Sequence, residues 1–145
     1  MRDINDAKAL LSEEIRCAVL KGDKTFLSDK KGIRPLMELI NGGEDYSGCI
    51  AADKIVGKAA ALLYVKIGAV EVYAEVLSKA AIGVLEDNGI KYSYGTVVEF
   101  IRNRTGDGMC PMEMTVAEIS DPTEAVEALR KTIAILMSGK ATAKA

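Results

Sequence analysis

The feature that most constrains this chain is an alternation of short β-rich segments with longer helical ones between residues 48 and 94. Residues 48–52, 70–77 and 90–94 are predicted strands, and segments 53–67 and 78–87 between them carry apolar residues at helical spacing. Gly68 and Gly89 follow the helical segments, as expected at helix ends. Strands joined through helices pair in parallel and need helices packed on the sheet. The sequence therefore predicts an α/β fold.

The flanking segments add a hairpin and further helices to this central unit. Residues 3–14 are a predicted helix, and residues 15–20 and 25–27 are predicted strands joined by a turn at Gly22. Pro35 begins a short predicted helix over 35–40, and two more helices are expected over 110–119 and 121–137. A chain of 145 residues suits a single domain, which we place at residues 1–137 with a disordered tail at 138–145.

The residue types that are present exclude several kinds of site. The chain has no histidine, which rules out a histidine-based zinc site or catalytic triad. Its three cysteines are widely spaced and form neither a metal-binding pair nor a disulfide framework. A net charge of −2 and an aromatic content of 5% give no basis for a nucleic-acid partner. Because the sequence shows no long apolar stretch and no signal-peptide core, we expect no membrane contact. The odd number and wide spacing of the cysteines favour a reducing, cytoplasmic location. We expect no cofactor.

The first candidate site lies where the predicted strand 48–52 passes into the following helix. Asp53 is predicted to cap that helix, Lys54 and Lys58 lie four residues apart on one face, and Gly57 permits a close approach. Free N–H groups at a helix start, beside two lysines, suit an anion such as a phosphate. The alternative is structural, with a capping aspartate, solvated lysines and a glycine packed on the sheet.

Two further candidates lie between residues 102 and 113. Cys110 is the predicted N-cap of a helix that has Pro111 first and Glu113 third, a position where the helix dipole favours a thiolate. Cys110 and Glu113 are therefore candidate catalytic groups, and the alternative is a structural cap with a small buried thiol. Arg104, in the polar loop 102–108, is a candidate ligand for a phosphate, and a plain surface loop is the alternative.

Four segments carry a resemblance to a known family. They are Gly32-Ile33-Arg34-Pro35-Leu36, the string 52–61, Tyr92-Ser93-Tyr94-Gly95 and Cys110-Pro111-Met112-Glu113. In this order they resemble the domain-of-unknown-function family 1893, within the cytidine deaminase-like superfamily, over residues 15–119. The resemblance implies a three-layer α/β/α sandwich with a mixed five-stranded sheet.

The resemblance also implies a site that has lost its metal. Deaminases of this fold hold zinc between two helix starts through histidine or cysteine ligands. Here Ala51, Leu77 and Ala80 occupy the implied ligand positions, and Asp53 replaces the glutamate that shuttles protons. The implied pocket, without metal, is lined by Ala51, Asp53, Lys54 and Ser78.

Three functions follow from these observations. The leading hypothesis is a metal-free domain that binds a nucleotide or a ribose phosphate as its small-molecule partner. The ligand-binding residues expected for it are Asp53, Lys54, Lys58, Ser78 and Arg104. One alternative is a zinc-independent enzyme that uses Asp53 or Cys110, and the other is a regulatory or structural module that forms homo-oligomers.

Overall fold

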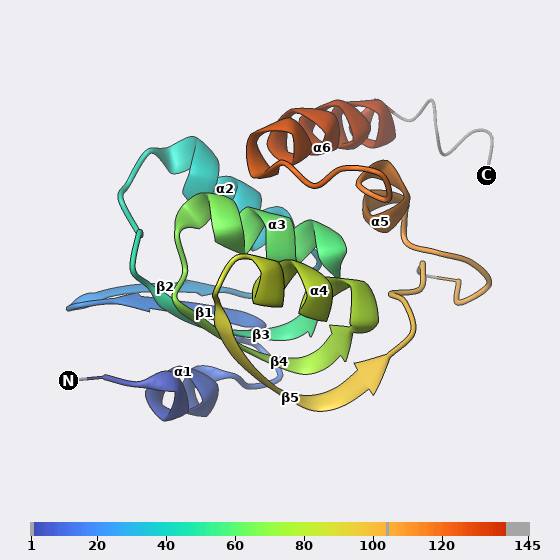
Figure 1. The fold of residues 1–145 in the computed structure, drawn as a ribbon. Helices are drawn as coiled ribbons and strands as arrows, with labels where there is room; N and C mark the ends of the chain where they lie inside the picture. The colour runs from blue at the N-terminus through green and yellow to red at the C-terminus, as the bar shows by residue number, and fades with distance from the viewer. Residues whose placement is uncertain (1, 104, 139–145) are drawn as a thin grey trace.

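The computed structural model describes residues 2–103 and 105–138. Its centre is a five-stranded sheet in the order β2-β1-β3-β4-β5 (Figure 1). β1 (Cys17–Lys21) and β2 (Lys24–Ser28) form an antiparallel hairpin, and β1 also runs antiparallel to β3 (Ile50–Val56). β4 (Glu71–Ser78) and β5 (Lys91–Val98) extend the sheet in parallel with β3. The predicted mixed five-stranded sheet is confirmed.

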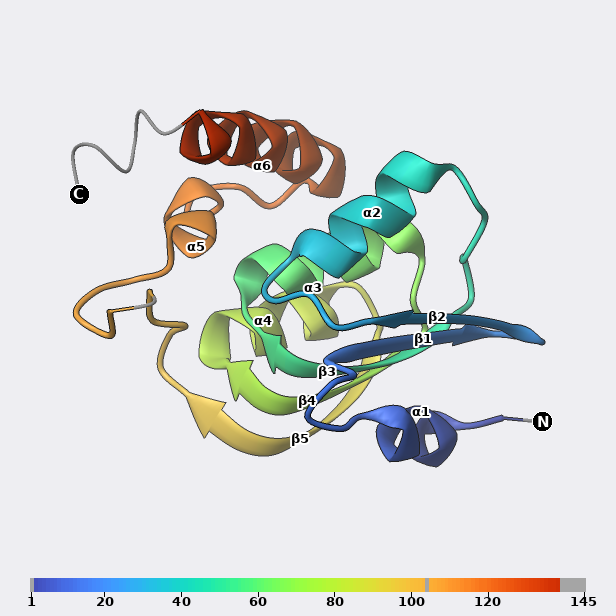
Figure 2. The ribbon, with the colours of Figure 1, turned by 180° about the vertical axis from the view of Figure 1, so that it is seen from behind.

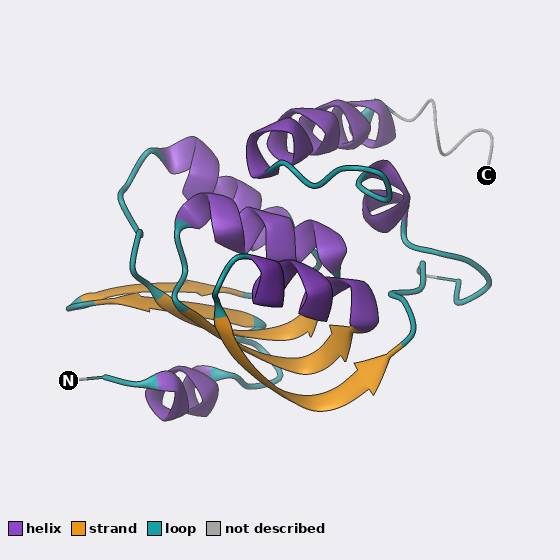
Figure 3. Ribbon diagram, in the orientation of Figure 1, coloured by secondary structure: helices purple, strands orange, loops and turns teal. Residues whose placement is uncertain are grey.

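Helices pack on both faces of this sheet. α1 (Ile4–Leu10) lies on one face, whereas α2 (Arg34–Gly42), α3 (Lys58–Ile67) and α4 (Lys79–Asp87) cover the other (Figure 3). α5 (Pro111–Thr115) and α6 (Pro122–Met137) form a further layer on the outer side of α3 (Figure 2). No helix in the described part of the chain is long and apolar enough to cross a membrane.

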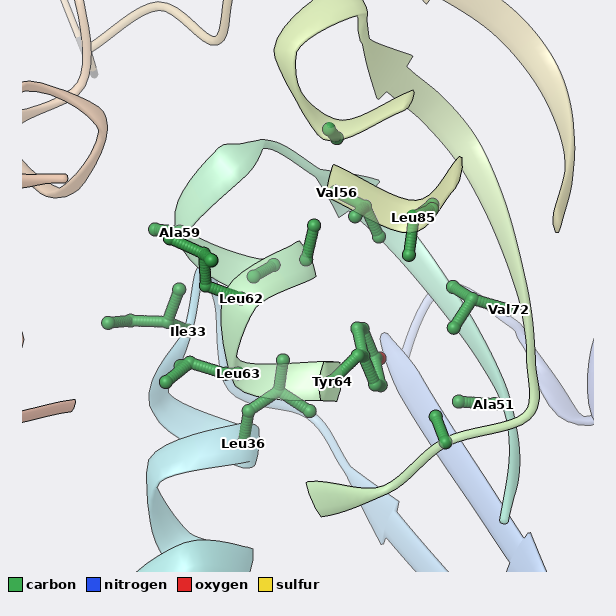
Figure 4. Close-up of a cluster of buried hydrophobic side chains, with 14 of the residues drawn as sticks. Ile33, Leu36, Ala51, Val56, Ala59, Leu62, Leu63, Tyr64, Val72 and Leu85 are labelled. Atoms are coloured by element: carbon green, nitrogen blue, oxygen red, sulfur yellow. The ribbon is translucent and has the colours of Figure 1, made fainter. Parts of the chain in front are cut away.

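α3 is the central helix of the domain because it lies between the sheet and the outer helices. Its residues from Ala59 to Tyr64 are all buried, as expected for a helix that is apolar on every side. Figure 4 shows Leu36 extending from α2 toward α3, while Tyr64 extends toward the strands. The phenol of Tyr64 is thereby placed inside the layer between α3 and the sheet.

Several predicted helix ends are confirmed. Gly68 ends α3 in a left-handed conformation at φ 93°, which glycine adopts without a steric penalty. Ser78 begins α4, and its hydroxyl accepts the Ala81 N–H at 3.1 Å. Cys110 is the N-cap of α5, followed by Pro111 as the first helical residue. These positions follow from local capping chemistry, which the sequence shows directly.

The predicted helix start at Asp53 is wrong. β3 continues through Asp53 to Val56, and α3 begins at Lys58 after the N-cap Gly57. Asp53 lies in the middle of the strand, opposite Cys17 of β1 and Ala74 of β4. Pairing on both sides overrides the capping preference of aspartate, because a strand between two neighbours satisfies its backbone groups through the sheet.

Other boundaries differ by a few residues. α1 ends at Leu10 because Leu11 is extended, with ψ 137°. β5 continues to Val98, and α5 ends early, at Thr115. The expected disordered tail lies outside the described residues from position 139 onward.

Candidate functional site

Two helices begin side by side at the carboxyl ends of β3 and β4. β3 and β4 are parallel neighbours with Val56 opposite Leu77, so the residues that follow, Gly57 and Ser78, lie next to each other. Neighbouring strands are about 5 Å apart. α3 starts after Gly57 and α4 after Ser78. This is the carboxyl end of parallel strands, where open α/β sheets bind their ligands.

A carboxylate from a distant segment occupies the start of α3. The Glu113 carboxylate accepts the N–H of Lys58 at 2.7 Å and the N–H of Ala59 at 2.8 Å. The residue is 8% exposed, so these charge-assisted bonds lie out of bulk solvent. Gly57 makes room for it, since a Cβ there would lie 2.5–2.7 Å from the carboxylate atoms. The start of α3 therefore holds an oxyanion, supplied by the protein itself.

The segment that carries Glu113 is fastened over α3 by other contacts as well. The Lys58 ammonium donates to the Ala117 carbonyl at 2.9 Å. Val116 is fully buried in the main core, and Met112 packs against that core. Residues before and after Glu113 are therefore packed against the core or bonded to α3, and they hold its carboxylate in place.

The second helix start is satisfied locally. Ser78 is fully buried, and its hydroxyl caps α4 through Ala81. The polar group of Ser78 is therefore used within α4 and is not exposed to solvent. Of the expected ligand-binding residues, the structure brings Lys58 and Ser78 to the carboxyl ends of β3 and β4.

Asp53 belongs to a different group of residues, buried between β3 and α3. The Tyr64 hydroxyl donates to its carboxylate at 2.8 Å, and the Cys17 thiol lies 3.6 Å from the same hydroxyl. Burial raises the pKa of Asp53 from 3.8 to about 7, against the opposing effects of the Tyr64 hydrogen bond and the charge of Arg16. Burial likewise raises the pKa of the Cys17 thiol, as does the nearby Asp53 carboxylate. Asp53 is 5% exposed and therefore has almost no contact with solvent.

Lys54 lies on the opposite face of the sheet from α3. Ala52, two residues earlier, packs with Ala7 of α1, and side chains alternate along a strand. The Lys54 ammonium pairs with the Glu75 carboxylate at 3.2 Å. The expectation that Lys54 and Lys58 share one helix face is wrong, because only Lys58 is in the helix.

The remaining candidates are also separated. Cys110 is partly buried at the start of α5, three residues before Glu113, and makes no side-chain cap. Arg104 lies outside the described residues. Ala51, expected to line the cleft with Ser78, pairs with Val72, six residues before Ser78 along β4. The expected lining by Ala51 is therefore wrong.

The helix starts do not fit a zinc ion. Gly57, Lys58 and Ser78 offer no histidine nitrogen or cysteine sulfur, which are the usual ligands of protein zinc sites. Across residues 2–103 and 105–138, no three His, Cys, Asp or Glu side chains form a group that could hold a metal.

Sequence reasoning missed two pairings in this region. The bond from Tyr64 to Asp53 joins residues 11 apart across a strand and a helix, and no short motif marks it. The contact of Glu113 with the start of α3 joins residues 55 apart. Gly57 was the one sign of the Glu113 contact in the sequence, because a glycine at this position allows another group to lie close to the backbone. The group that lies there is the Glu113 side chain of the same protein.

The fit between Gly57 and Glu113 predicts a specific loss of stability. Gly57→Ala is expected to cost about 1–3 kcal/mol of unfolding free energy by overpacking. Backbone strain is not the reason, because Gly57 has φ −100°, which alanine adopts freely. Gly83→Ala, on an open face of α4, is the matched control and should stabilise slightly.

Chemical denaturation of both variants, with and without Glu113→Ala, checks this prediction. Without the carboxylate, the Gly57→Ala penalty should largely disappear. An equal penalty in both backgrounds would show that Gly57 is needed for another reason.

Comparison with known proteins places this chain in a family. No protein of curated function matches it. A crystal structure of a DUF1893 family protein from Thermotoga maritima is similar, with 30% identity, 82% of this chain and 81% of that chain covered, and a TM-score of 0.75. The family model described as TM1506, domain of unknown function (DUF1893), matches residues 6–133. The chain thus belongs to the DUF1893 family.

Proposed function

We propose that this domain binds a small anionic molecule, of the nucleotide or ribose-phosphate type, where α3 and α4 begin. The observation that carries the proposal is the Glu113 carboxylate, bound by two backbone N–H groups at the first turn of α3. A site that holds a buried carboxylate has the donors and the local positive potential that an incoming oxyanion needs.

A phosphate suits this site better than the carboxylate that fills it. A phosphate monoester carries nearly two negative charges and three strong acceptor oxygens, whereas a carboxylate has one charge and two oxygens. Lys58, whose ammonium lies at the same helix start and bonds to Ala117, supplies a further positive charge. Binding thus requires that the ligand phosphate displaces Glu113 from the N–H groups of Lys58 and Ala59.

We propose nucleotides and ribose phosphates as the ligands because the chain resembles the cytidine deaminase-like superfamily. That superfamily relationship is itself part of the proposal. Folds of that kind accept nucleosides and nucleotides at paired helix starts. Of the residues expected to bind the ligand, Lys58 belongs to this site, whereas Ser78 is fully buried and its hydroxyl caps α4. Asp53 is buried against Tyr64 and Lys54 lies on the other face, so neither is part of it. The zinc-independent enzyme and the cytoplasmic location stay predictions.

The proposal is tested by thermal-shift measurements with inorganic phosphate, ribose 5-phosphate and nucleoside monophosphates. A ligand at about 100 times its dissociation constant adds about 2.7 kcal/mol of stability, which raises the Tm by several degrees. Glu113→Gln should bind more tightly than the wild type, since a neutral amide competes less well for the helix start.

Lys58→Ala and Lys66→Ala form a matched pair for this experiment. Both lysines lie on α3, but Lys66 is exposed in the last turn, where it bonds to Thr123. Lys58→Ala should reduce the shift and Lys66→Ala should leave it unchanged. No shift with any of these compounds, in the wild type or in Glu113→Gln, would contradict the proposal.

A further inference from the structure

A groove of about 400 Å³ lies between α2 and α6, which run side by side in opposite directions (Figures 1 and 2). α2 lines it with Arg34, Met37, Glu38 and Asn41. α6 lines it with Arg130, Ile133, Ala134 and Met137. Both sets follow the spacing i, i+3, i+4 and i+7, so each helix presents one face to the groove. Small-molecule sites have volumes of about 300–1,000 Å³, so the groove is large enough for a small ligand.

The middle of the groove is apolar. Met37 is 5% exposed, and Ile133 packs against the main core, so these two side chains form a fixed floor. Met137 lies beside them on α6 and is 73% exposed. An exposed methionine that continues an apolar floor is typical of a binding surface, because its unbranched side chain adapts to the shape of a partner.

Cationic side chains lie at both ends of this floor. At one end the Arg130 guanidinium donates to the Asn41 side-chain oxygen of α2 at 2.8 Å and to Glu127 at 2.6 Å. At the other end Lys30 pairs with Glu38 at 2.9 Å. Arg34, which is exposed at the start of α2, has no hydrogen-bond or ion-pair partner within residues 2–103 and 105–138.

The charge of the groove is opposite to that of the whole chain. Its lining includes three cationic side chains and one carboxylate, which gives it a net charge of +2. The whole chain has a net charge of −2. An apolar floor with an excess of positive charge complements a ligand that is both apolar and anionic.

We infer that this groove binds a straight-chain carboxylate, with the carboxylate on Arg34 and the chain along Met37 and Ile133. A guanidinium without a partner can bind a carboxylate through two parallel N–H groups. The seven-residue span of each lining face is about 10 Å long at 1.5 Å per residue. The bond from Arg130 to Asn41 closes the far end, so a chain of medium length fits best.

The size of the groove favours a small molecule over a protein partner. A stable protein interface buries roughly 800 Å² on each side, which is more than a groove about 10 Å long provides. The inference does not rest on the function proposed above, because neither Lys58 nor Glu113 lines this groove.

Isothermal titration calorimetry of the full chain with octanoate tests the inference. The wild type should bind octanoate. It should bind 1-octanol and acetate at least about tenfold more weakly, since the first lacks the charge and the second lacks the apolar chain. Arg34→Gln should weaken octanoate binding about tenfold, as expected for the loss of a charge-assisted hydrogen bond. Ala134→Leu, which fills the groove from an exposed position on α6, should abolish binding.

Lys131→Gln is the matched control for Arg34→Gln. Lys131 is an exposed cation of α6 that does not line the groove, so its loss should leave octanoate affinity unchanged. Lys58→Ala should also leave it unchanged, which separates this site from the one at the start of α3. Circular dichroism of each variant shows whether it is folded.

The inference is overturned if the wild type does not bind octanoate, or if it binds 1-octanol equally well. Octanoate affinity that ignores both Arg34→Gln and Ala134→Leu would place the ligand on another surface. An equal loss in Lys131→Gln and Arg34→Gln would mean general attraction between charges, without a site in the groove.

Discussion

The free energy of unfolding is expected to fall by about 4 kcal/mol as the pH rises from 4 to beyond 7, because of one buried carboxyl group. Burial raises the pKa of Asp53 from 3.8 to about 7 in the folded protein. The difference is about three pKa units, and each is worth about 1.4 kcal/mol. The folded state therefore binds this proton more tightly than the unfolded chain does.

The direction of the effect follows from proton linkage. Below pH 4 Asp53 is protonated in both states, and its stabilising contribution is fully present. As the pH rises through 7 the folded protein must ionise a buried group, and that contribution is lost. Asp45 and Asp107 act in a separate window, since local hydrogen bonds lower their pKa values below 3.8. Their contribution is lost only in stronger acid.

Urea denaturation at pH 4.5 and pH 8 measures this change. The wild type should be markedly more stable at pH 4.5, and Asp53→Asn should show little difference between the two, since an amide does not ionise. The Tyr64 hydroxyl can still donate to the side-chain oxygen of the introduced asparagine, so the variant should fold. Equal stability of the wild type at both pH values would contradict this expectation. So would an Asp53→Asn variant whose stability changes with pH as much as that of the wild type.

Tyr64→Phe has the second largest expected effect, and it depends on pH. The substitution keeps the buried ring and removes the hydroxyl that donates to Asp53 at 2.8 Å. A hydrogen bond to a charged group is worth about 1.5–3 kcal/mol, and the remaining carboxylate is left buried without this donor. We expect a loss of that size at pH 8 and a smaller one at pH 4.5, where Asp53 is protonated.

Tyr92→Phe is the matched control for this experiment. The Tyr92 hydroxyl donates to the Glu86 carboxylate at 2.6 Å, the same chemical pair, but on the surface. Exposed pairs of this kind contribute little because water replaces the lost partner. If the two variants lose equal stability at pH 8, burial is not what makes the Asp53–Tyr64 bond important.

Much of the fold could be predicted because its signals are local. The helix ends at Gly68, Ser78 and Asp121 follow from capping chemistry and were placed correctly. The hairpin and the parallel strands follow from periodicity and the order of elements. β3 was the main failure, since an aspartate after a short apolar run has the same local appearance as a helix cap. Only pairing with β1 and β4 identifies it as a strand residue.

The site was less predictable than the fold because it depends on contacts between distant residues. Gly57, Lys58 and Ser78 were singled out from the sequence, and they directly follow the paired residues Val56 and Leu77 at the carboxyl ends of β3 and β4. Glu113 was a candidate for a local reason, its place in the first turn of α5, whereas its carboxylate lies on α3. Asp53 was expected beside Lys54 and Lys58 at a helix start. Because Asp53 and Lys54 are instead consecutive residues of a strand, their side chains point to opposite faces of the sheet.

The most direct test of the account follows the backbone amides of Lys58 and Ala59 by NMR while ribose 5-phosphate is added to Glu113→Gln. If the start of α3 is an anion site held by the protein's own carboxylate, these two amides should show the largest shifts, and the wild type should need more ligand for the same change. Shifts that leave both amides unmoved, or that gather at another surface, would mean that Glu113 is only a structural cap.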